Sequence, residues 1–222
     1  MILKICGITN QDDASAAIEA GATAVGFNFY APSPRYLAPQ QAAGIVTAAG
    51  VRRVGVFVNE KRQRVEEIVR IAALDVAQLH GDETPADYPN VARATSGRSN
   101  QPLPDGRGSE RLSLAVWKAL RVGESFDIAL YRDNPAEALL LDGPAAGLYG
   151  GSGKSFDWRL VRRSSRKIVL AGGLDASNVA AAIELVRPWG VDACSRIESA
   201  PGRKDRKKMS EFLQAARAAV SV

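Results

Sequence analysis

The stretch ALLLDGPAAGLYGGSGKSFDW, residues 138–158, contains an apolar run, a single acidic residue, a loop rich in Gly and Ser, and a helix start in direct succession. The apolar run at 138–141 predicts a buried parallel strand, which would place Asp142 at the carboxyl edge of a sheet. The bare backbone of the following loop is suited to binding an anion through its amides. The same pattern also fits a strand, a turn and a capped helix in which Asp142 bonds only to turn amides.

The same order of strand and then helix repeats along the whole chain. Eight units of this kind in 222 residues predict an α/β fold, a single-domain (β/α)8 TIM barrel over residues 1–222, with an open doubly wound sheet as the alternative. The predicted strands are 2–6, 24–29, 51–58, 76–80, 114–120, 138–141, 167–171 and 191–194. The predicted helices are 10–20, 39–49, 62–72, 85–93, 125–132, 156–163, 177–186 and 204–220.

One segment interrupts this rhythm. Residues 96–113, SGRSNQPLPDGRGSERLS, are polar, rich in Gly, Pro and Arg, and without hydrophobic periodicity. This composition predicts a flexible insertion between the fourth helix and the fifth strand. A segment that joins a helix to the next strand lies on the amino-terminal face of such a barrel, away from its active site.

The composition argues against a nucleic-acid-binding protein and against a membrane protein. The net charge of +5 suits an anionic ligand, but the basic runs at 162–167 and 203–208 lie at or beside predicted helices, so we expect solvated faces there. Aromatic residues are sparse and not interleaved with these charges, which argues against nucleic-acid binding. No apolar run approaches the ~18 residues that cross a membrane, and no targeting signal opens the chain. We therefore expect a cytoplasmic protein with no membrane partner. We also expect the protein to be a monomer.

The ends of the predicted strands carry candidate chemistry. In a barrel the active site lies at these ends, where Cys6 would supply a thiol and Asp142 a carboxyl group to one pocket. Such a pair can act as base and acid if its surroundings tune the two pKa values. His80 has no acidic or metal partner nearby in the sequence, so we interpret it as structural. With one histidine and two cysteines that lack zinc spacing, we expect no metal site.

Three late strand ends carry backbone suited to phosphate. Glycine allows a close approach of the backbone, and exposed amides can donate to anionic oxygens. The quadrant formed by the last strands often holds phosphate in these barrels. The candidate phosphate-binding residues are Gly151 and Gly153 after the sixth strand, Gly172 and Gly173 after the seventh, and Cys194 and Ser195 after the eighth.

These motifs together resemble the phosphoribosylanthranilate isomerase family. The resemblance spans nearly the whole chain except 95–113, in the order and spacing of the family. The motifs that carry it are KICGIT at 4–9, GFNFYAPSPRYL at 26–37, GVFVN at 55–59, QLHGDE at 78–83, LLLDG with GGSGKSFDW within 139–158, LAGGL at 170–174 and GVDACSRIESAPGRKD at 190–205.

The resemblance implies an Amadori rearrangement that needs no cofactor. N-(5′-phosphoribosyl)anthranilate, a small phosphorylated substrate, would be converted to 1-(o-carboxyphenylamino)-1-deoxyribulose 5-phosphate, a step of tryptophan biosynthesis. Asp142 would be the general acid that opens the ribose ring, and Cys6 the general base that removes the C2′ proton. Arg35 would pair with the anthranilate carboxylate. Asp192 would bond to a ribose hydroxyl or orient the base.

Three residues depart from the family pattern after the eighth strand: Ala193, Cys194 and Arg196. The family stretch is close to DVSSG, whereas this chain has Asp192-Ala193-Cys194-Ser195-Arg196. Arg196 replaces a glycine, which either adds a contact to phosphate or strains a backbone that needs positive φ. Because the first and eighth strands of a barrel are neighbours, Cys6 and Cys194 should lie close together. We expect oxidants to inactivate the protein reversibly by joining or capping these thiols.

Two other functions fit the same sequence. One is another phosphosugar-barrel isomerase, either the histidine-pathway enzyme or a bifunctional version of it. Such relatives use a carboxylate where this chain has Cys6, and they carry two phosphate sites. The other is a catalytically idle barrel that binds phosphorylated ligands, for which Arg196 is the only support.

Overall fold

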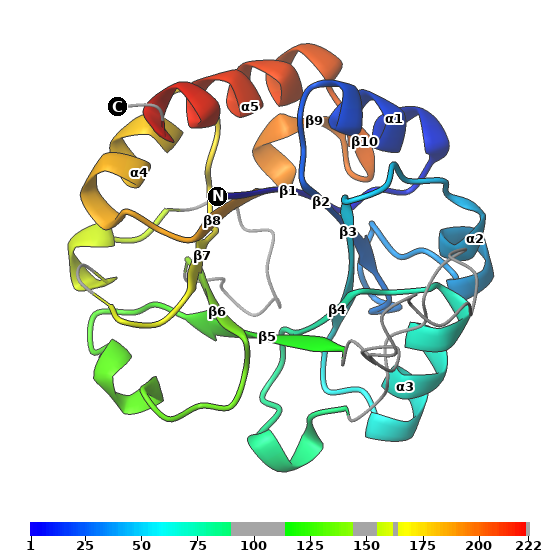
Figure 1. Cartoon of the computed structure of the whole chain (residues 1–222), viewed down its shortest axis with the longest axis horizontal. Helices are drawn as coiled ribbons and strands as arrows, with labels where there is room; N and C mark the ends of the chain where they lie inside the picture. The colour runs from blue at the N-terminus through cyan, green and yellow to red at the C-terminus, as the bar shows by residue number, and fades with distance from the viewer. Residues whose placement is uncertain (90–113, 144–154, 162–163, 221–222) are drawn as a thin grey trace, which may run out of the picture.

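The computed structural model describes residues 1–89, 114–143, 155–161 and 164–220. Eight parallel strands follow one another around a closed barrel, which confirms the predicted (β/α)8 fold (Figure 1). The first and last strands close the barrel with Lys4 opposite Asp192. The strands are β1 Ile2–Cys6, β2 Ala24–Asn28, β3 Arg52–Phe57, β4 Val76–Leu79, β5 Ala115–Arg121, β6 Ala138–Asp142, β7 Ile168–Leu170 and β8 Gly190–Ala193.

Helices surround the barrel, and α5 lies between α4 and α1 where the two ends of the chain meet (Figure 1). The first of them begins where its cap predicts, because the Asn10 side chain accepts a hydrogen bond from the Asp13 amide at 2.8 Å. The helices are α1 Gln11–Glu19, α2 Pro39–Gly44, α3 Arg62–Ile71, α4 Val179–Val186 and α5 Arg206–Val220.

Within three of the predicted helical ranges the described residues contain a short 3₁₀ helix. These are η1 Pro85–Asp87, η2 Ile128–Tyr131 and η3 Trp158–Val161. The helical segment predicted over 125–132 is therefore present, and it is shorter than expected. The predicted insertion at 96–113 lies outside the described residues.

Alternation along the strands divides the apolar residues between two cores. One face of each strand points outward and packs against the helices, as Ile5, Phe27 and Leu141 do. The other face fills the barrel interior, where Val54 and Trp117 are among the buried side chains. The interior face ends in polar residues at the carboxyl ends of the strands, and these residues form the site described below.

A two-stranded hairpin follows the last barrel strand and was not anticipated from the sequence. Its strands are β9 Glu198–Ala200 and β10 Arg203–Lys204, joined through Gly202 at φ +79°. The hairpin is tied to the start of α1, because Asp13 accepts a hydrogen bond from the Lys204 amide. Lys204 is thereby buried, so the expectation of a fully solvated basic face at 203–208 is wrong at this position.

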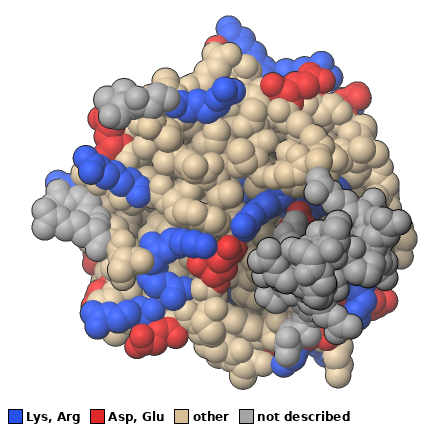
Figure 2. Space-filling model, viewed as in Figure 1, with Lys and Arg blue, Asp and Glu red and all other residues tan. Residues whose placement is uncertain are grey.

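Charges elsewhere on the surface are mixed. On the face shown in Figure 2, lysine and arginine side chains are interspersed with acidic ones instead of forming one continuous basic patch. Within the part of the chain that the structure describes, no helix is long and apolar enough to span a membrane.

Candidate active site

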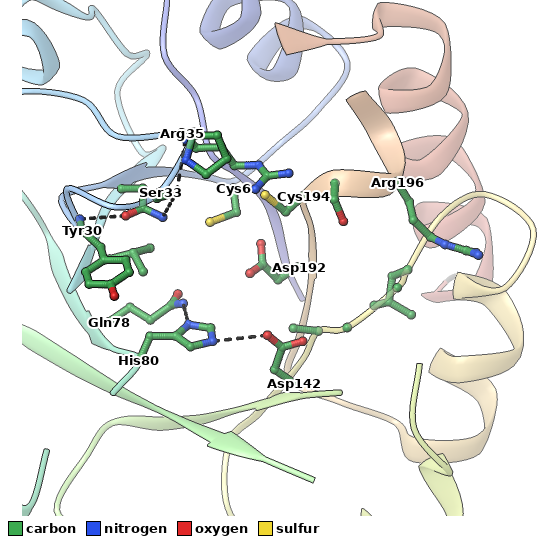
Figure 3. A pocket seen from close by; sticks show the side chains of 18 of the residues that line it. Cys6, Tyr30, Ser33, Arg35, Gln78, His80, Asp142, Asp192, Cys194 and Arg196 are labelled. Atoms are coloured by element: carbon green, nitrogen blue, oxygen red, sulfur yellow. Dashed lines mark hydrogen bonds and ion pairs between the residues drawn. The ribbon is translucent and has the colours of Figure 1, made fainter. Parts of the chain in front are cut away.

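A cavity of about 360 Å³ opens at the carboxyl ends of the barrel strands. The strands deliver their polar ends to it because every second residue faces the barrel interior. Figure 3 shows side chains from the two ends of the chain and from its middle pointing into the same space. Its polar lining includes Cys6, Arg35, His80, Asp142, Asp192 and Cys194.

Cys6 lies beside a buried ion pair. Lys4 and Asp192 face each other across the β1–β8 seam, and Lys4 Nζ lies 2.8 Å from Asp192 Oδ2. The charge of Lys4 also acts on the Cys6 thiol and lowers its pKa. Gly26 provides the space for this arrangement, since a Cβ there would lie 2.9 Å from Cys6 Sγ and 3.1 Å from Lys4 Cε. A buried ammonium is thus held between a carboxylate and the candidate base.

The surroundings of Cys6 favour its thiolate. A hydrogen bond from Cys194 has the largest effect and lowers the pKa of the Cys6 thiol. Burial opposes this, but the charges of Lys4 and Lys204 lower the pKa further, and the result is a pKa well below the ordinary range. The pKa of Cys194 is raised, because its thiol proton is held in the hydrogen bond to Cys6 and because it is buried. Cys6 is therefore the sulfur prepared to act as a base.

Asp192 stands between the two candidate catalytic groups (Figure 3). Burial raises its pKa to about 7, even though the charge of Lys4 acts in the opposite direction. Its Oδ1 is buried without a hydrogen-bond partner among the described residues, and so is Oε1 of Gln78. Both side chains line the cavity, so both oxygens are available to polar groups of a ligand.

Asp142 is held by donors on both oxygens. Oδ1 accepts a hydrogen bond from the Gly143 amide at 2.8 Å, and Oδ2 lies 3.2 Å from Nε2 of His80. The Gln78 amide nitrogen lies 3.0 Å from His80 Nδ1. An amide nitrogen can only donate, so Nδ1 accepts and the imidazole proton sits on Nε2, facing Asp142. His80 therefore has the acidic partner that the sequence did not reveal, and the argument for a purely structural role is wrong.

Arg35 extends into the cavity from the loop after β2, and the β9–β10 hairpin holds its guanidinium group in place. Its Nε and Nη2 donate to the carboxylate of Glu198 at 2.9 and 2.7 Å. Lys204 Nζ donates to the same carboxylate at 2.7 Å. Burial raises the pKa of Glu198, but the hydrogen bond from Arg35 and the charge of Lys204 outweigh it and lower the pKa below its usual value. One edge of the guanidinium is engaged, and Nη1 is directed away from this pair.

The predicted phosphate-binding backbone lies on one wall of the cavity as far as it is described. Gly172 and Gly173, at φ +81° and +65°, line it together with Cys194 and Ser195. Both glycines adopt a left-handed conformation that other residues rarely take. Gly151 and Gly153 lie outside the described residues, so the structure does not test them.

For Arg196 the structure excludes the backbone strain considered from the sequence and does not test a contact with phosphate. Its backbone is not among the positive-φ positions, so the strain that a lost glycine would cause is absent. Its Nη1 lies 2.7 Å from Asp175 Oδ2 in a half-exposed ion pair, and the guanidinium points away from Cys6 and Asp142 (Figure 3). The side chain therefore leaves the centre of the cavity open.

Comparisons with known proteins agree with this geometry. The family model described as N-(5′-phosphoribosyl)anthranilate (PRA) isomerase matches residues 3–101 and 107–215. A curated relative from Solibacter usitatus, named N-(5′-phosphoribosyl)anthranilate isomerase, is 62% identical over 99% of both chains. This chain belongs to the phosphoribosylanthranilate isomerase family.

Solved structures of phosphoribosylanthranilate isomerases superpose on nearly the whole chain. The enzyme from Thermotoga maritima has a TM-score of 0.80 at 35% identity and covers 98% of this chain and 100% of its own. Another, solved in complex with reduced 1-(o-carboxyphenylamino)-1-deoxyribulose 5-phosphate, has a TM-score of 0.78 at 35% identity with the same coverage.

Sequence reasoning missed several residues of this phosphoribosylanthranilate isomerase site. Gln78 and His80 alternate along β4 and the residue after it, so their shared face was a usable signal. Glu198 and Lys204 gave no such signal, because they lie in a hairpin that only tertiary contacts define. Within the described residues, no cluster of three or more His, Cys, Asp or Glu could hold a metal ion.

Replacing Lys4 tests the electrostatic control of Cys6. In Lys4→Met we expect the pH midpoint of Cys6 alkylation by iodoacetamide to move upward, because the thiolate loses its neighbouring cation. At pH values below the midpoint, a rise of one pKa unit lowers the thiolate fraction, and with it the alkylation rate, about tenfold. Peptide mass spectrometry separates Cys6 from Cys194. Lys61→Met, at an exposed lysine, is the matched control, and an unchanged midpoint in Lys4→Met would contradict this role.

Gly172 tests the packing beneath Asp142. A Cβ at this position would lie 2.5 Å from the Gly143 nitrogen and 2.9 Å from Asp142 Oδ1. We expect Gly172→Ala to displace the carboxyl group and lower kcat about 100-fold, as displacements of about 1 Å do. Gly123→Ala is the control, because a Cβ there meets nothing within 4 Å. Wild-type turnover in Gly172→Ala would show that Asp142 does not depend on this contact.

Proposed function

We propose that this protein converts N-(5′-phosphoribosyl)anthranilate to 1-(o-carboxyphenylamino)-1-deoxyribulose 5-phosphate, with Asp142 as general acid and Cys6 as general base. The observation that carries the proposal is the common cavity of a thiol with lowered pKa and a carboxyl group on the far side of Asp192. The family membership favours this reaction over that of the histidine-pathway isomerase.

Asp142 begins the reaction by protonating the ribose ring oxygen. The bond between C1′ and the ring oxygen then breaks, and the electron pair of the anthranilate nitrogen forms a Schiff base with C1′. The carboxylate left on Asp142 is stabilised by the Gly143 amide and by Nε2–H of His80. His80 thus acts as a positioning residue that favours release of the proton, and Gln78 holds its imidazole in the required tautomer.

Cys6 carries out the second proton transfer. Its thiolate removes the proton from C2′, and the electrons of that bond move into the Schiff base to form an enolamine. Tautomerisation of the enolamine gives the ketone and restores a proton to C1′. The lowered pKa of Cys6 supplies the thiolate at neutral pH, and the ammonium of Lys4 keeps this charge balanced in a buried site.

The remaining polar groups bind the carboxylate, the ribose hydroxyls and the phosphate of the substrate. The free edge of Arg35 pairs with the anthranilate carboxylate, and Glu198 holds the guanidinium in place. The unpartnered oxygens of Asp192 and Gln78 accept hydrogen bonds from ribose hydroxyls. The phosphate is bound by backbone amides of the loops containing Gly151, Gly153, Gly172 and Gly173 and of Cys194 and Ser195.

The protein is expected to act as a monomer in the cytoplasm. Both cysteines are free thiols, which suits a reducing compartment. One solved relative, from Thermotoga maritima, is described as monomers generated from a dimeric phosphoribosylanthranilate isomerase. Sedimentation velocity distinguishes the two assemblies for this chain.

A turnover assay with freshly prepared N-(5′-phosphoribosyl)anthranilate tests the proposal. We expect the wild type to form product, and Cys6→Ala and Asp142→Ala each to lower kcat by roughly 10²- to 10⁴-fold, the usual range for loss of a general acid or base. Circular dichroism checks that the variants fold. A folded wild type that binds the substrate without turning it over would contradict the proposal and indicate an idle binding barrel.

A further inference from the structure

Two cysteines from opposite ends of the chain become neighbours where the barrel closes. The register of β1 and β8 runs from Ile2 opposite Gly190 to Ile5 opposite Ala193. One residue further along this register stand Cys6 and Cys194. Neighbouring strands lie about 4.8 Å apart, and disulfides join Cα atoms separated by roughly 4.4–6.8 Å. The closed barrel therefore places the two residues at the ends of neighbouring strands, on the same side of the seam.

Both side chains also reach the same part of the cavity. The Cys194 thiol lowers the pKa of the Cys6 thiol, and both sulfurs lie on the same side of the cavity in Figure 3. Each sulfur occupies space left open by a glycine: a Cβ at Gly7 would lie 3.1 Å from Cys194 Sγ, and one at Gly26 would lie 2.9 Å from Cys6 Sγ. The two thiols thus share one wall of the cavity beside the barrel seam.

We propose that Cys6 and Cys194 form a peroxide-reactive dithiol, a covalent modification site in which a hydroperoxide converts the two thiols into a reversible disulfide. Both residues line the cavity, so a small hydroperoxide reaches them by the route that a substrate would use. Oxidation at this site removes the base Cys6 from the catalytic pair. That consequence for turnover rests on the proposed function, whereas the modification itself does not.

The charges around the pair favour attack by Cys6. The charges of Lys4 and Lys204 both act on the Cys6 thiol, and Lys204 Nζ lies 4.0 Å from Cys194 Sγ. These ammonium groups stabilise the negative charge on sulfur that nucleophilic attack requires. Cys194 keeps its proton until the second step, which gives the two thiols different roles: Cys6 attacks first and Cys194 resolves.

The chemistry balances with a hydroperoxide as the oxidant. The Cys6 thiolate attacks the terminal peroxide oxygen, so an S–O bond forms, the O–O bond breaks, and the peroxide is reduced to water or an alcohol after it takes up a proton. Cys6 becomes a sulfenic acid. The Cys194 sulfur then attacks Cys6, the S–S bond forms and the S–O bond breaks, and water leaves with the thiol proton of Cys194. A dithiol reductant returns both thiols by exchange.

Treatment of the full-length protein with hydrogen peroxide, followed by removal of the peroxide with catalase, tests the site. We expect the wild type to lose both free thiols under denaturing conditions and to lose the mass of two hydrogen atoms. Peptide mapping should show a Cys6–Cys194 cross-link that dithiothreitol removes. These three readouts require no turnover, so a failure of the proposed isomerase activity would leave them unaffected.

Cys194→Ser is the matched variant, because a hydroxyl retains a hydrogen-bond donor beside Cys6 but cannot form a disulfide. Each protein is compared with its own untreated activity. We expect dithiothreitol to restore the oxidised wild type, while Cys194→Ser gains oxygen at Cys6 as sulfinic acid and stays inactive. Oxygen addition to Cys6 in the wild type without a cross-link would overturn the proposal, as would retention of both thiols.

Discussion

The pairing of β1 with β8 is the constraint on which the rest of the structure depends. It closes the barrel, and it places Lys4 opposite Asp192 at the seam. Without this closure, Cys6 and Asp192 would lie at opposite edges of an open sheet, nearly two hundred residues apart in sequence, and the cavity would not form. An ion pair buried at the seam is costly unless its geometry is good, and here one oxygen of Asp192 bonds Lys4 while the other faces the cavity. The β1–β8 pairing therefore both closes the barrel and places Lys4 and Asp192 beside the cavity.

Cys6 and Asp142 have separate sets of neighbouring polar residues on two sides of the cavity. Cys194, Lys4 and Lys204 lower the pKa of Cys6 and favour its thiolate, while His80 and the Gly143 amide hold Asp142. A base and an acid in one small site need environments that differ, because identical surroundings would shift both groups toward the same protonation state. Asp192, whose pKa is raised to about 7 by burial, lies between the two groups. The same arrangement leaves a reactive thiolate next to a second thiol.

Sequence reasoning recovered the barrel because buried parallel strands give continuous apolar runs and their ends carry the chemistry. This reasoning found Cys6, Asp142 and Asp192, because each of them ends a predicted strand or lies on the strand face that points into the barrel. The sequence could not show which strands touch, so the contact between His80 and Asp142 stayed hidden. The hairpin that buries Lys204 was likewise beyond reach, because its charged sequence is typical of an exposed helix start and only the contact with Asp13 fixes it. Short connections such as η2 were overestimated where a proline ends the turn.

The central claim is that Cys6 and Asp142 act on one substrate from opposite sides of a single closed cavity. A crystal structure of this protein with reduced 1-(o-carboxyphenylamino)-1-deoxyribulose 5-phosphate, the compound bound in the related enzyme, tests it most directly. We expect the sulfur of Cys6 next to C2′, a carboxyl oxygen of Asp142 on the other face of the sugar chain, and the phosphate at the amides of Gly172 and Gly173. A complex in which the sugar chain contacts only one of the two catalytic residues, or in which the phosphate binds elsewhere, would contradict it.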